Sequence, residues 1–353
     1  MKNKSILSII LAAAILFTGC NSGKAVTTEK SDITEVNKTT ETSAVSEPAP
    51  TEKKASEPFE FNPHVYSGKV AERIPQDYWD ALYNLCDALR KGETTFKCAN
   101  QDAYWWATDT AVLCCYMPTA GGKLERGGKD DLDTYKNGVG KFRLDMPMED
   151  FLKRQADFEA LIVDILNSTV EKDDTDYEKA LKLYLYIANN YKYTTEVDEY
   201  ENYVYKAFTK KTGMCVNFAA IYAYLLLQVG IDAVNVGIYE EDMCHAWTIV
   251  TINGKSYHVD TTWALKSDEN PYISLDYFLM SDEERINEGC LVRNLSVSVF
   301  PEEWANETSV SFAANDTSYL LRPYCRFISL DEDKKIVHYL DVEDKPQEFH
   351  YDI

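Results

Sequence analysis

A cysteine, a histidine and an aspartate in the middle of the chain could together carry out nucleophilic catalysis. Cys215 follows Thr212-Gly213-Met214, and the chain after it is apolar almost all round as far as Val229. A helix that is apolar on every side is buried in the middle of a domain, and Gly230 suits the left-handed position that ends such a helix. We therefore expect Cys215 in the first turn of a central helix, where unpaired N–H groups and the helix dipole favour a thiolate. A buried structural cysteine is the alternative reading of this residue.

The histidine and the aspartate lie on two runs that predict a β-hairpin. Residues 244–252 have a strand pattern, Asn253-Gly254 is a strong two-residue turn signal, and residues 255–263 return as the second strand. A two-residue turn fixes the register, and side chains repeat on one face every second residue. His245 and Asp260 then share a face as diagonal neighbours, about 7–8 Å apart between backbones, which an imidazole and a carboxylate can bridge.

These three residues predict a Cys-His-Asp triad. The Cys215 thiolate would attack a carbonyl carbon, His245 would take and return the proton, and Asp260 would orient the imidazole and stabilise its cation. The N–H of Cys215 could supply one donor to the oxyanion. Tyr203 and Tyr205 lie upstream and are candidates for the second donor.

Two neighbouring residues have plainer readings. Cys244 projects from the strand face opposite His245, so no chemistry is assigned to it. His258 shares the face of His245 but lies farther from Cys215 on this register, and it reads as a surface or core histidine. Cys215, Cys244 and His245 could be taken for zinc ligands, but the opposed strand faces argue against this. We expect no metal and no cofactor.

The segments that carry these residues resemble the transglutaminase-like superfamily, whose folds are similar to papain-like cysteine proteases. The resemblance extends over about Asp174 to Arg285. It implies that Cys215 is the nucleophile, His245 the base and Asp260 the third member of the triad. The matching motifs are Gly213-Met214-Cys215, Gly230-Ile231, His245-Ala246-Trp247 and Val259-Asp260-Thr261-Thr262-Trp263.

The sequence departs from the family pattern at two positions. Thr248 stands where many members have Asn, and Thr261 stands where many have Pro. Neither departure removes a triad residue. Because the family includes cross-linking, deamidating, peptide-cleaving and catalytically silent members, the fold cannot choose the reaction.

Helical patterns dominate the chain before the site. Adjacent Trp105 and Trp106 could form a ligand platform, but at helical spacing they read as core. The periodicity predicts helices over 75–91, 102–116, 148–170 and 176–193, a loop over 119–140 and a short strand at 142–144. After Val297 the pattern predicts a small β unit, with strands over 319–330, 335–340 and 347–353.

The first twenty residues predict export. Lys2 and Lys4 precede an apolar run from Ile6 to Phe17 that is too short to span a membrane. The small residues before Cys20 resemble a bacterial lipoprotein signal, in which Cys20 is lipidated and becomes the new N-terminus. An ordinary cleaved signal with an incidental cysteine is the alternative. We expect a lipid-anchored extracytoplasmic protein on the bacterial cell membrane or envelope.

The composition excludes several classes of protein. Of 353 residues, 36 are Lys or Arg and 58 are Asp or Glu, which gives a net charge of −22. A nucleic-acid partner would need a basic face, so it is not expected. The aromatic content of 12% excludes a wholly disordered acidic chain. Nine cysteines are too few for a disulfide scaffold, and adjacent Cys114 and Cys115 read as buried thiols.

We therefore expect an α+β fold with a transglutaminase-like core, in which the cysteine-bearing helix packs on an antiparallel sheet. The function expected is a surface-anchored thiol enzyme for acyl transfer or hydrolysis of peptide or protein amides, with cell-wall peptide among the substrates. A catalytically silent peptide- or polymer-binding module and a structural envelope protein with a dead site are the alternatives. The expected regions are a signal peptide (1–20), a disordered tether (21–58), an N-terminal helical region (59–173), the core (174–290) and a C-terminal β unit (291–353).

Overall fold

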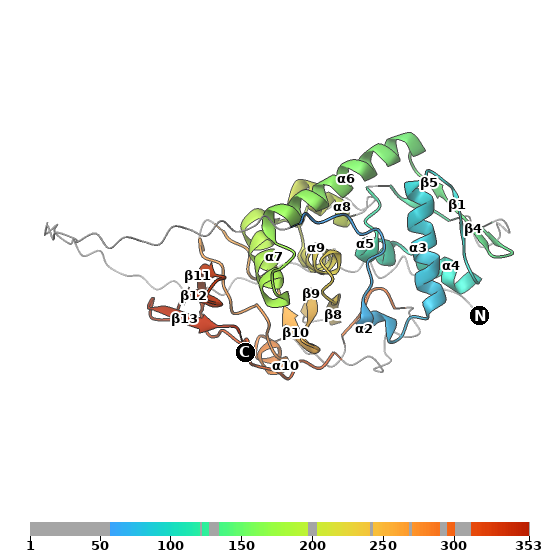
Figure 1. Cartoon of the computed structure of the whole chain (residues 1–353). Coiled ribbons are helices and arrows are strands. Elements are labelled where there is room, and N and C mark those ends of the chain that lie inside the picture. Colours follow the sequence, from blue (N-terminus) through green and yellow to red (C-terminus); the bar gives the residue numbers. More distant parts are fainter. Residues whose placement is uncertain are drawn as a thin grey trace, which may run out of the picture. The chain divides into compact units, whose positions relative to one another are not determined.

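A buried apolar helix lies against a three-stranded antiparallel sheet, and this pair carries the predicted site (Figure 1). The helix is α9 (Cys215–Gln228), and every side chain in it from Asn217 onward is buried. The sheet has the order β10 (Lys255–Val259), β9 (Met243–Ile252) and β8 (Ala233–Glu240). The predicted α+β class, with the cysteine-bearing helix packed on an antiparallel sheet, is confirmed.

The structure is a computed structural model in which residues 56–353 form one unit. It describes residues 57–120, 122–126, 134–196, 203–240, 243–267, 270–289, 295–300 and 312–352. The predicted signal peptide, Cys20 and nearly all of the tether lie outside the described residues, and the predicted region borders stay predictions. Within the described residues, no helix has the length and apolar character needed to cross a membrane.

The hairpin has the predicted register. Lys255 pairs with Ile252, and the ladder continues to Val259 opposite Thr248. Asn253 and Gly254 have φ values of 52° and 75°, as a tight hairpin turn requires.

The predicted extension of the second strand to Trp263 is wrong, because β10 ends at Val259. The next residue, Asp260, turns the chain: its Oδ1 accepts the N–H groups of Thr262 (3.0 Å) and Trp263 (3.3 Å). A short acidic side chain that binds the backbone N–H groups following it competes with the strand ladder.

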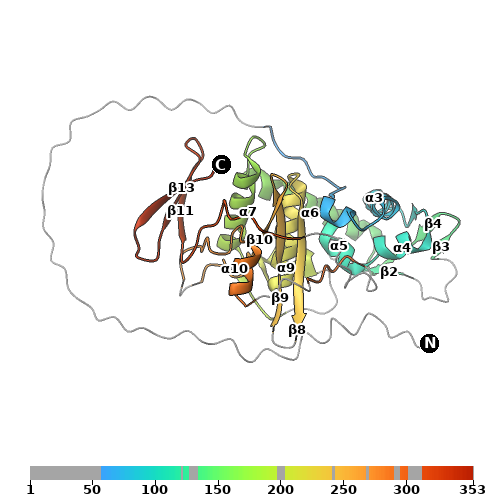
Figure 2. The same cartoon turned by 90° about the horizontal axis from the view of Figure 1, so that it is seen from below.

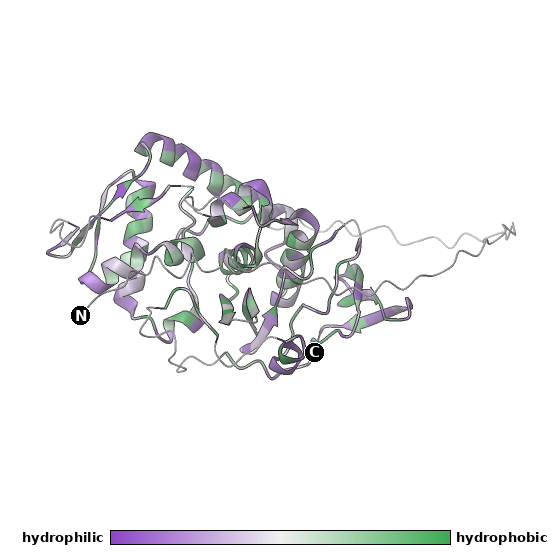
Figure 3. Cartoon of the chain, turned by 180° about the vertical axis from the view of Figure 1, so that it is seen from behind, coloured by the Kyte–Doolittle hydropathy of each residue, from purple (hydrophilic) through white to green (hydrophobic). Residues whose placement is uncertain are grey.

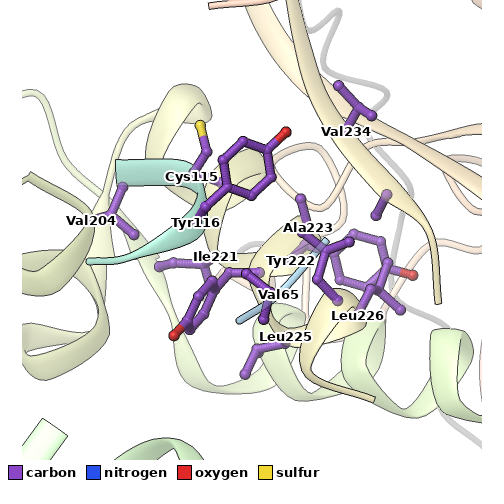
Figure 4. Close-up of a cluster of buried hydrophobic side chains, with 14 of the residues drawn as sticks. Val65, Cys115, Tyr116, Val204, Ile221, Tyr222, Ala223, Leu225, Leu226 and Val234 are labelled. Atoms are coloured by element: carbon purple, nitrogen blue, oxygen red, sulfur yellow. The ribbon is translucent and has the colours of Figure 1, made fainter. Parts of the chain in front are cut away.

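Helices cover the remaining sides of α9, and the core forms among them. The helices α5 (Thr110–Tyr116), α7 (Asp176–Asn190) and α8 (Tyr203–Lys210) all contact α9. Figure 4 shows Leu225 and Leu226 of α9 beside Val65 and Ala223 in the buried cluster. Figure 3 shows α9 mainly in the hydrophobic colour and α6 (Met148–Thr169) in mixed colours, as expected for a buried and an amphipathic helix.

The N-terminal region is mainly helical, as predicted, with two corrections. The predicted helix over 102–116 is two helices, because the Asp109 carboxylate caps a new start by accepting the N–H of Ala111 (2.9 Å). The predicted loop over 119–140 contains short strands, which pair with each other and with Thr95–Lys97 and Arg143–Leu144. The further elements here are α2 (Gly68–Ala71), α3 (Gln76–Arg90), α4 (Gln101–Ala107), β1 (Thr95–Lys97), β2 (Leu124–Glu125), β3 (Tyr135–Lys136), β4 (Val139–Lys141) and β5 (Arg143–Leu144).

The C-terminal strands form a separate three-stranded antiparallel sheet beside α7 (Figure 2). They are β11 (Arg326–Asp331), β12 (Ile336–Leu340) and β13 (Pro346–His350). Buried Glu178 of α7 binds this unit through Lys335 Nζ (2.7 Å) and Tyr351 Oη (2.6 Å). The first strand begins later than predicted, since the chain turns before it, around Pro323, which has no N–H to donate to a ladder.

We predict that Gly213→Ala destabilises the chain by about 1–3 kcal/mol. A Cβ at this position would stand 2.8 Å from both Cβ and Oδ1 of Asn217, and the Asn217 Cβ is fixed to the α9 backbone. Denaturant unfolding of the full chain measures the effect, with Lys210→Ala on the exposed end of α8 as the control. Equal stability of the two variants would contradict the close approach.

Candidate active site

Cys215 is the first residue of α9, as predicted. The preceding residues, β7 (Thr212–Gly213), pair in parallel with β6 (Lys192–Tyr193), which fixes the entry to the helix. Asn217 Oδ1 accepts the N–H of Met214 (2.7 Å) and closes the first turn. As the first residue of α9, Cys215 lies at the positive end of a long helix. Its side chain is partly exposed, so a substrate can reach it.

The structure brings His245 and Asp260 into direct contact. His245 Nε2 lies 2.6 Å from Asp260 Oδ2, and the two side chains are 8% and 0% exposed. Cys215 lies close enough to His245 to raise the pKa of the imidazole. The structure therefore brings the three predicted residues together, with the imidazole bonded to the carboxylate and Cys215 near the imidazole.

The pKa of His245 is raised to about 9. Burial is the largest influence and acts against protonation, but the charge of Asp260, its hydrogen bond and the interaction with Cys215 outweigh it. Below about pH 9 this imidazole is therefore protonated, and it places a positive charge next to the Cys215 side chain.

Asp260 is held ionised although it is fully buried. Burial acts to raise its pKa, but His245 and Arg285, and the N–H of Trp263, together lower it. Arg285 Nη2 lies 2.9 Å from the same oxygen that His245 binds. Arg285 comes from α10 (Asp282–Asn287), and sequence reasoning did not assign it to the site.

Trp263 also belongs to the site and was missed as a functional residue. Its ring stacks on the His245 ring, with centroids 4.8 Å apart and planes 10° apart. The turn that Asp260 makes after β10 is what brings this indole back over the imidazole. Trp263 ends one of the motifs quoted above, so its sequence signal was present. Had the strand continued through Trp263, however, the indole would lie away from His245.

His258 is a core histidine, one of the two readings predicted. It is fully buried, and Trp247 Nε1 donates to its Nδ1 (2.8 Å). Because an indole can only donate, His258 carries its proton on Nε2 and donates it to Asp282 Oδ1 (2.8 Å). Burial lowers the pKa of His258. This neutral ring links Trp247 of β9 to Asp282 of α10.

Cys244 lies closer to the site than the sequence suggested. Strand alternation does put it on the face opposite His245. That face is the one α9 covers, since Thr248 on the same face donates to the carbonyl of Ala219 (3.0 Å). Burial raises the pKa of Cys244, and the charge of nearby Cys215 raises it further.

The structure does not support Tyr203 or Tyr205 as the second donor to the oxyanion. The ring of Tyr205 packs edge-on against Phe158, with centroids 5.5 Å apart. The side chain of Tyr203 lies outside the described residues. Tyr193 of β6 is instead the tyrosine that interacts electrostatically with Cys215, and its pKa is raised first by burial.

The remaining sequence candidates have structural roles. Trp106 is buried and donates to the carbonyl of Val299 (2.7 Å), as the core reading predicts. Cys114 and Cys115 are buried free thiols, as expected. Within the described ranges, no group of three or more His, Cys, Asp or Glu side chains is arranged to hold a metal ion.

Comparison with known protein families agrees with this geometry. Residues 163–261 match the model of the transglutaminase-like superfamily. This segment is transglutaminase-like. It contains Cys215, His245 and Asp260, so the resemblance drawn from their motifs is confirmed.

Comparison with solved structures adds little. The chain resembles the crystal structure of a candidate cysteine protease from Cytophaga hutchinsonii, with 20% identity and a TM-score of 0.26. The match covers 30% of this chain and 37% of that one. A likeness at this level carries no argument about activity. No curated protein matches the chain.

We predict that Asp260→Asn lowers the pKa of His245 from about 9 to below its ordinary value of about 6.5. Without the carboxylate charge, burial dominates and favours the neutral ring. NMR titration of ¹³C-labelled histidine in the full chain measures the change. Asp316→Asn, which removes the carboxylate that binds Lys255 and Tyr257, is the control and should leave His245 unchanged. An unchanged pKa in Asp260→Asn would show that the contact does not govern the imidazole.

Proposed function

We propose that this chain is a thiol enzyme that uses Cys215, His245 and Asp260 for acyl transfer to, or hydrolysis of, peptide or protein amides. The observation that carries the proposal is the 2.6 Å contact between the buried side chains of His245 and Asp260, next to a cysteine at a helix N-terminus. A core that only had to be stable would not bury an ionised carboxylate beside a protonated imidazole.

The geometry supports a two-step reaction. In the first step the Cys215 thiolate attacks the amide carbonyl carbon, and the His245 imidazolium gives its proton to the departing amine, which leaves a thioester. In the second step water or a primary amine attacks the thioester carbon, and neutral His245 takes the proton of the nucleophile. Cleavage of the carbon–sulfur bond returns the thiolate and the imidazolium. Asp260 orients the ring and balances its charge in both steps.

The cellular setting in the proposal comes from the sequence. A lipid on Cys20 would hold the protein on the outer side of the bacterial membrane, with the tether between anchor and enzyme. Proteins or peptides outside the cell, including cell-wall peptides, would then be the substrates. The net charge of −22 agrees with a partner that is neither nucleic acid nor an anionic lipid surface.

We predict that Cys215→Ala lowers turnover at least about 1,000-fold, because the proposed reaction uses Cys215 as its nucleophile. The full chain is incubated with glutamine-containing peptides and cell-wall peptides, and released ammonia, new amino termini and incorporated primary amine are measured. Mass spectrometry of the wild type should also find a thioester on Cys215.

Cys98→Ala, in the N-terminal region, is the matched control and should keep full activity. If the wild type binds these peptides without turnover, and Cys215→Ala binds them equally well, the chain is a binding module and the proposal is wrong.

A further inference from the structure

We propose that Arg285 is a positioning residue, which fixes Asp260 in its working orientation and sets how readily His245 gives up its proton. The inference rests on the proposed function, because it assigns a task within the same site. It starts from geometry: Arg285 is completely buried, and its Nη2 donates to Asp260 Oδ2 (2.9 Å). Arg285 therefore shares one carboxylate oxygen with His245 Nε2.

The guanidinium lies between two indole rings. Its central carbon is 4.2 Å from the ring centroid of Trp247 and 4.5 Å from that of Trp263. Trp263 in turn stacks on His245, so one indole contacts both the imidazole and the guanidinium. This packing holds the cation in one orientation relative to the carboxylate.

The cost of this arrangement argues for a role beyond packing. Arg285 Nε and Nη1 are buried and have no hydrogen-bond partner among the described residues. A buried charge with unpaired donors is unfavourable, and an apolar side chain of similar length would fill the space between the indoles at lower cost. What an apolar side chain would not supply is the positive charge beside Asp260.

That charge matters when His245 changes its protonation state. While the imidazole is protonated, it and Arg285 both face Asp260 Oδ2, and their mutual repulsion favours release of the imidazole proton. After His245 has given up its proton, Arg285 still balances the buried carboxylate. Arg285 thus allows His245 to act as an acid in one step and as a base in the next.

The other groups that face the pair do not provide this balance. Cys215 of α9 faces His245, while Tyr184 of α7 and Tyr277 after β10 interact with Asp260. Burial raises the pKa of both tyrosines, so they stay neutral at physiological pH. Among the described groups that interact with Asp260, Arg285 is therefore the permanent cation.

The helix that carries Arg285 is itself anchored to the sheet. Asp282, at the start of α10, accepts a hydrogen bond from His258 Nε2–H, and His258 Nδ1 accepts one from the indole N–H of Trp247. Trp247 is one of the two indoles that hold Arg285. His258 thus links the start of α10 to one of the indoles that pack on the guanidinium.

The test compares Arg285→Met, which removes the charge but keeps an unbranched apolar chain, with Arg285→Lys, which keeps the charge. The full chain with ¹³C-labelled histidine has five histidines to assign. We expect the His245 titration midpoint to rise by about one pH unit in Arg285→Met and to stay close to the wild type in Arg285→Lys. In Arg285→Met the alkaline limb of the pH profile of kcat should shift to higher pH by the same amount. At neutral pH, kcat should be about tenfold lower, with KM unchanged.

Arg322→Met is the matched control. Arg322 binds Glu288, next to α10, so its loss loosens the same helix without removing the charge from Asp260. It should leave the His245 titration unchanged. If Arg285→Met does not fold, Arg285→Gln takes its place, because it keeps hydrogen-bonding groups and loses the charge.

A folded Arg285→Met or Arg285→Gln with the wild-type His245 titration would overturn the inference. The proposed function fails separately. If the wild type shows no turnover while the His245 midpoint moves as expected in Arg285→Met, the role of Arg285 is supported and the proposed enzymatic function is wrong. If turnover is present and the midpoint does not move, the enzyme stands without this role for Arg285.

Discussion

A carboxylate without solvent contact is the constraint around which the site is built. Asp260 is completely buried, and a buried charge persists only where it is paired and hydrogen-bonded. The structure supplies four donors: His245 Nε2, Arg285 Nη2 and the N–H groups of Thr262 and Trp263. They come from β9, from α10 and from the turn after β10. These elements must therefore dock together before the carboxylate can be buried, so the fold and the site form as one.

The same carboxylate links the core to Cys215 through His245. By raising the pKa of His245 to about 9, Asp260 keeps the imidazole charged where it meets Cys215. The position of Cys215 depends in turn on the close approach of Gly213 and Asn217 at the start of α9. Two independent pieces of backbone, a helix start and a hairpin, thus bring Cys215 and His245 together, and the proposed reaction needs both.

Local signals could predict the hairpin and the helix start, because Asn253-Gly254 fixes the register and Gly213 precedes a continuous apolar run. The end of β10 could not be predicted, since it depends on the Asp260 side chain taking backbone N–H groups from the ladder. Arg285 reaches Asp260 from 25 residues further along the chain, and no spacing rule connects them. The sequence did not predict that Cys244 lies near Cys215. The alternation of side chains along a strand shows which face a residue is on, but it does not show which helix covers that face.

The central claim is that His245, charged by Asp260, makes Cys215 a reactive thiolate. The most direct measurement is the rate at which iodoacetamide alkylates Cys215 between about pH 6 and 10, compared in the wild type and His245→Ala. The account predicts faster alkylation of the wild type below about pH 9, where the imidazole is protonated, and convergence of the two rates above it. Equal rates at every pH would show that the contact seen in the structure does not activate the sulfur.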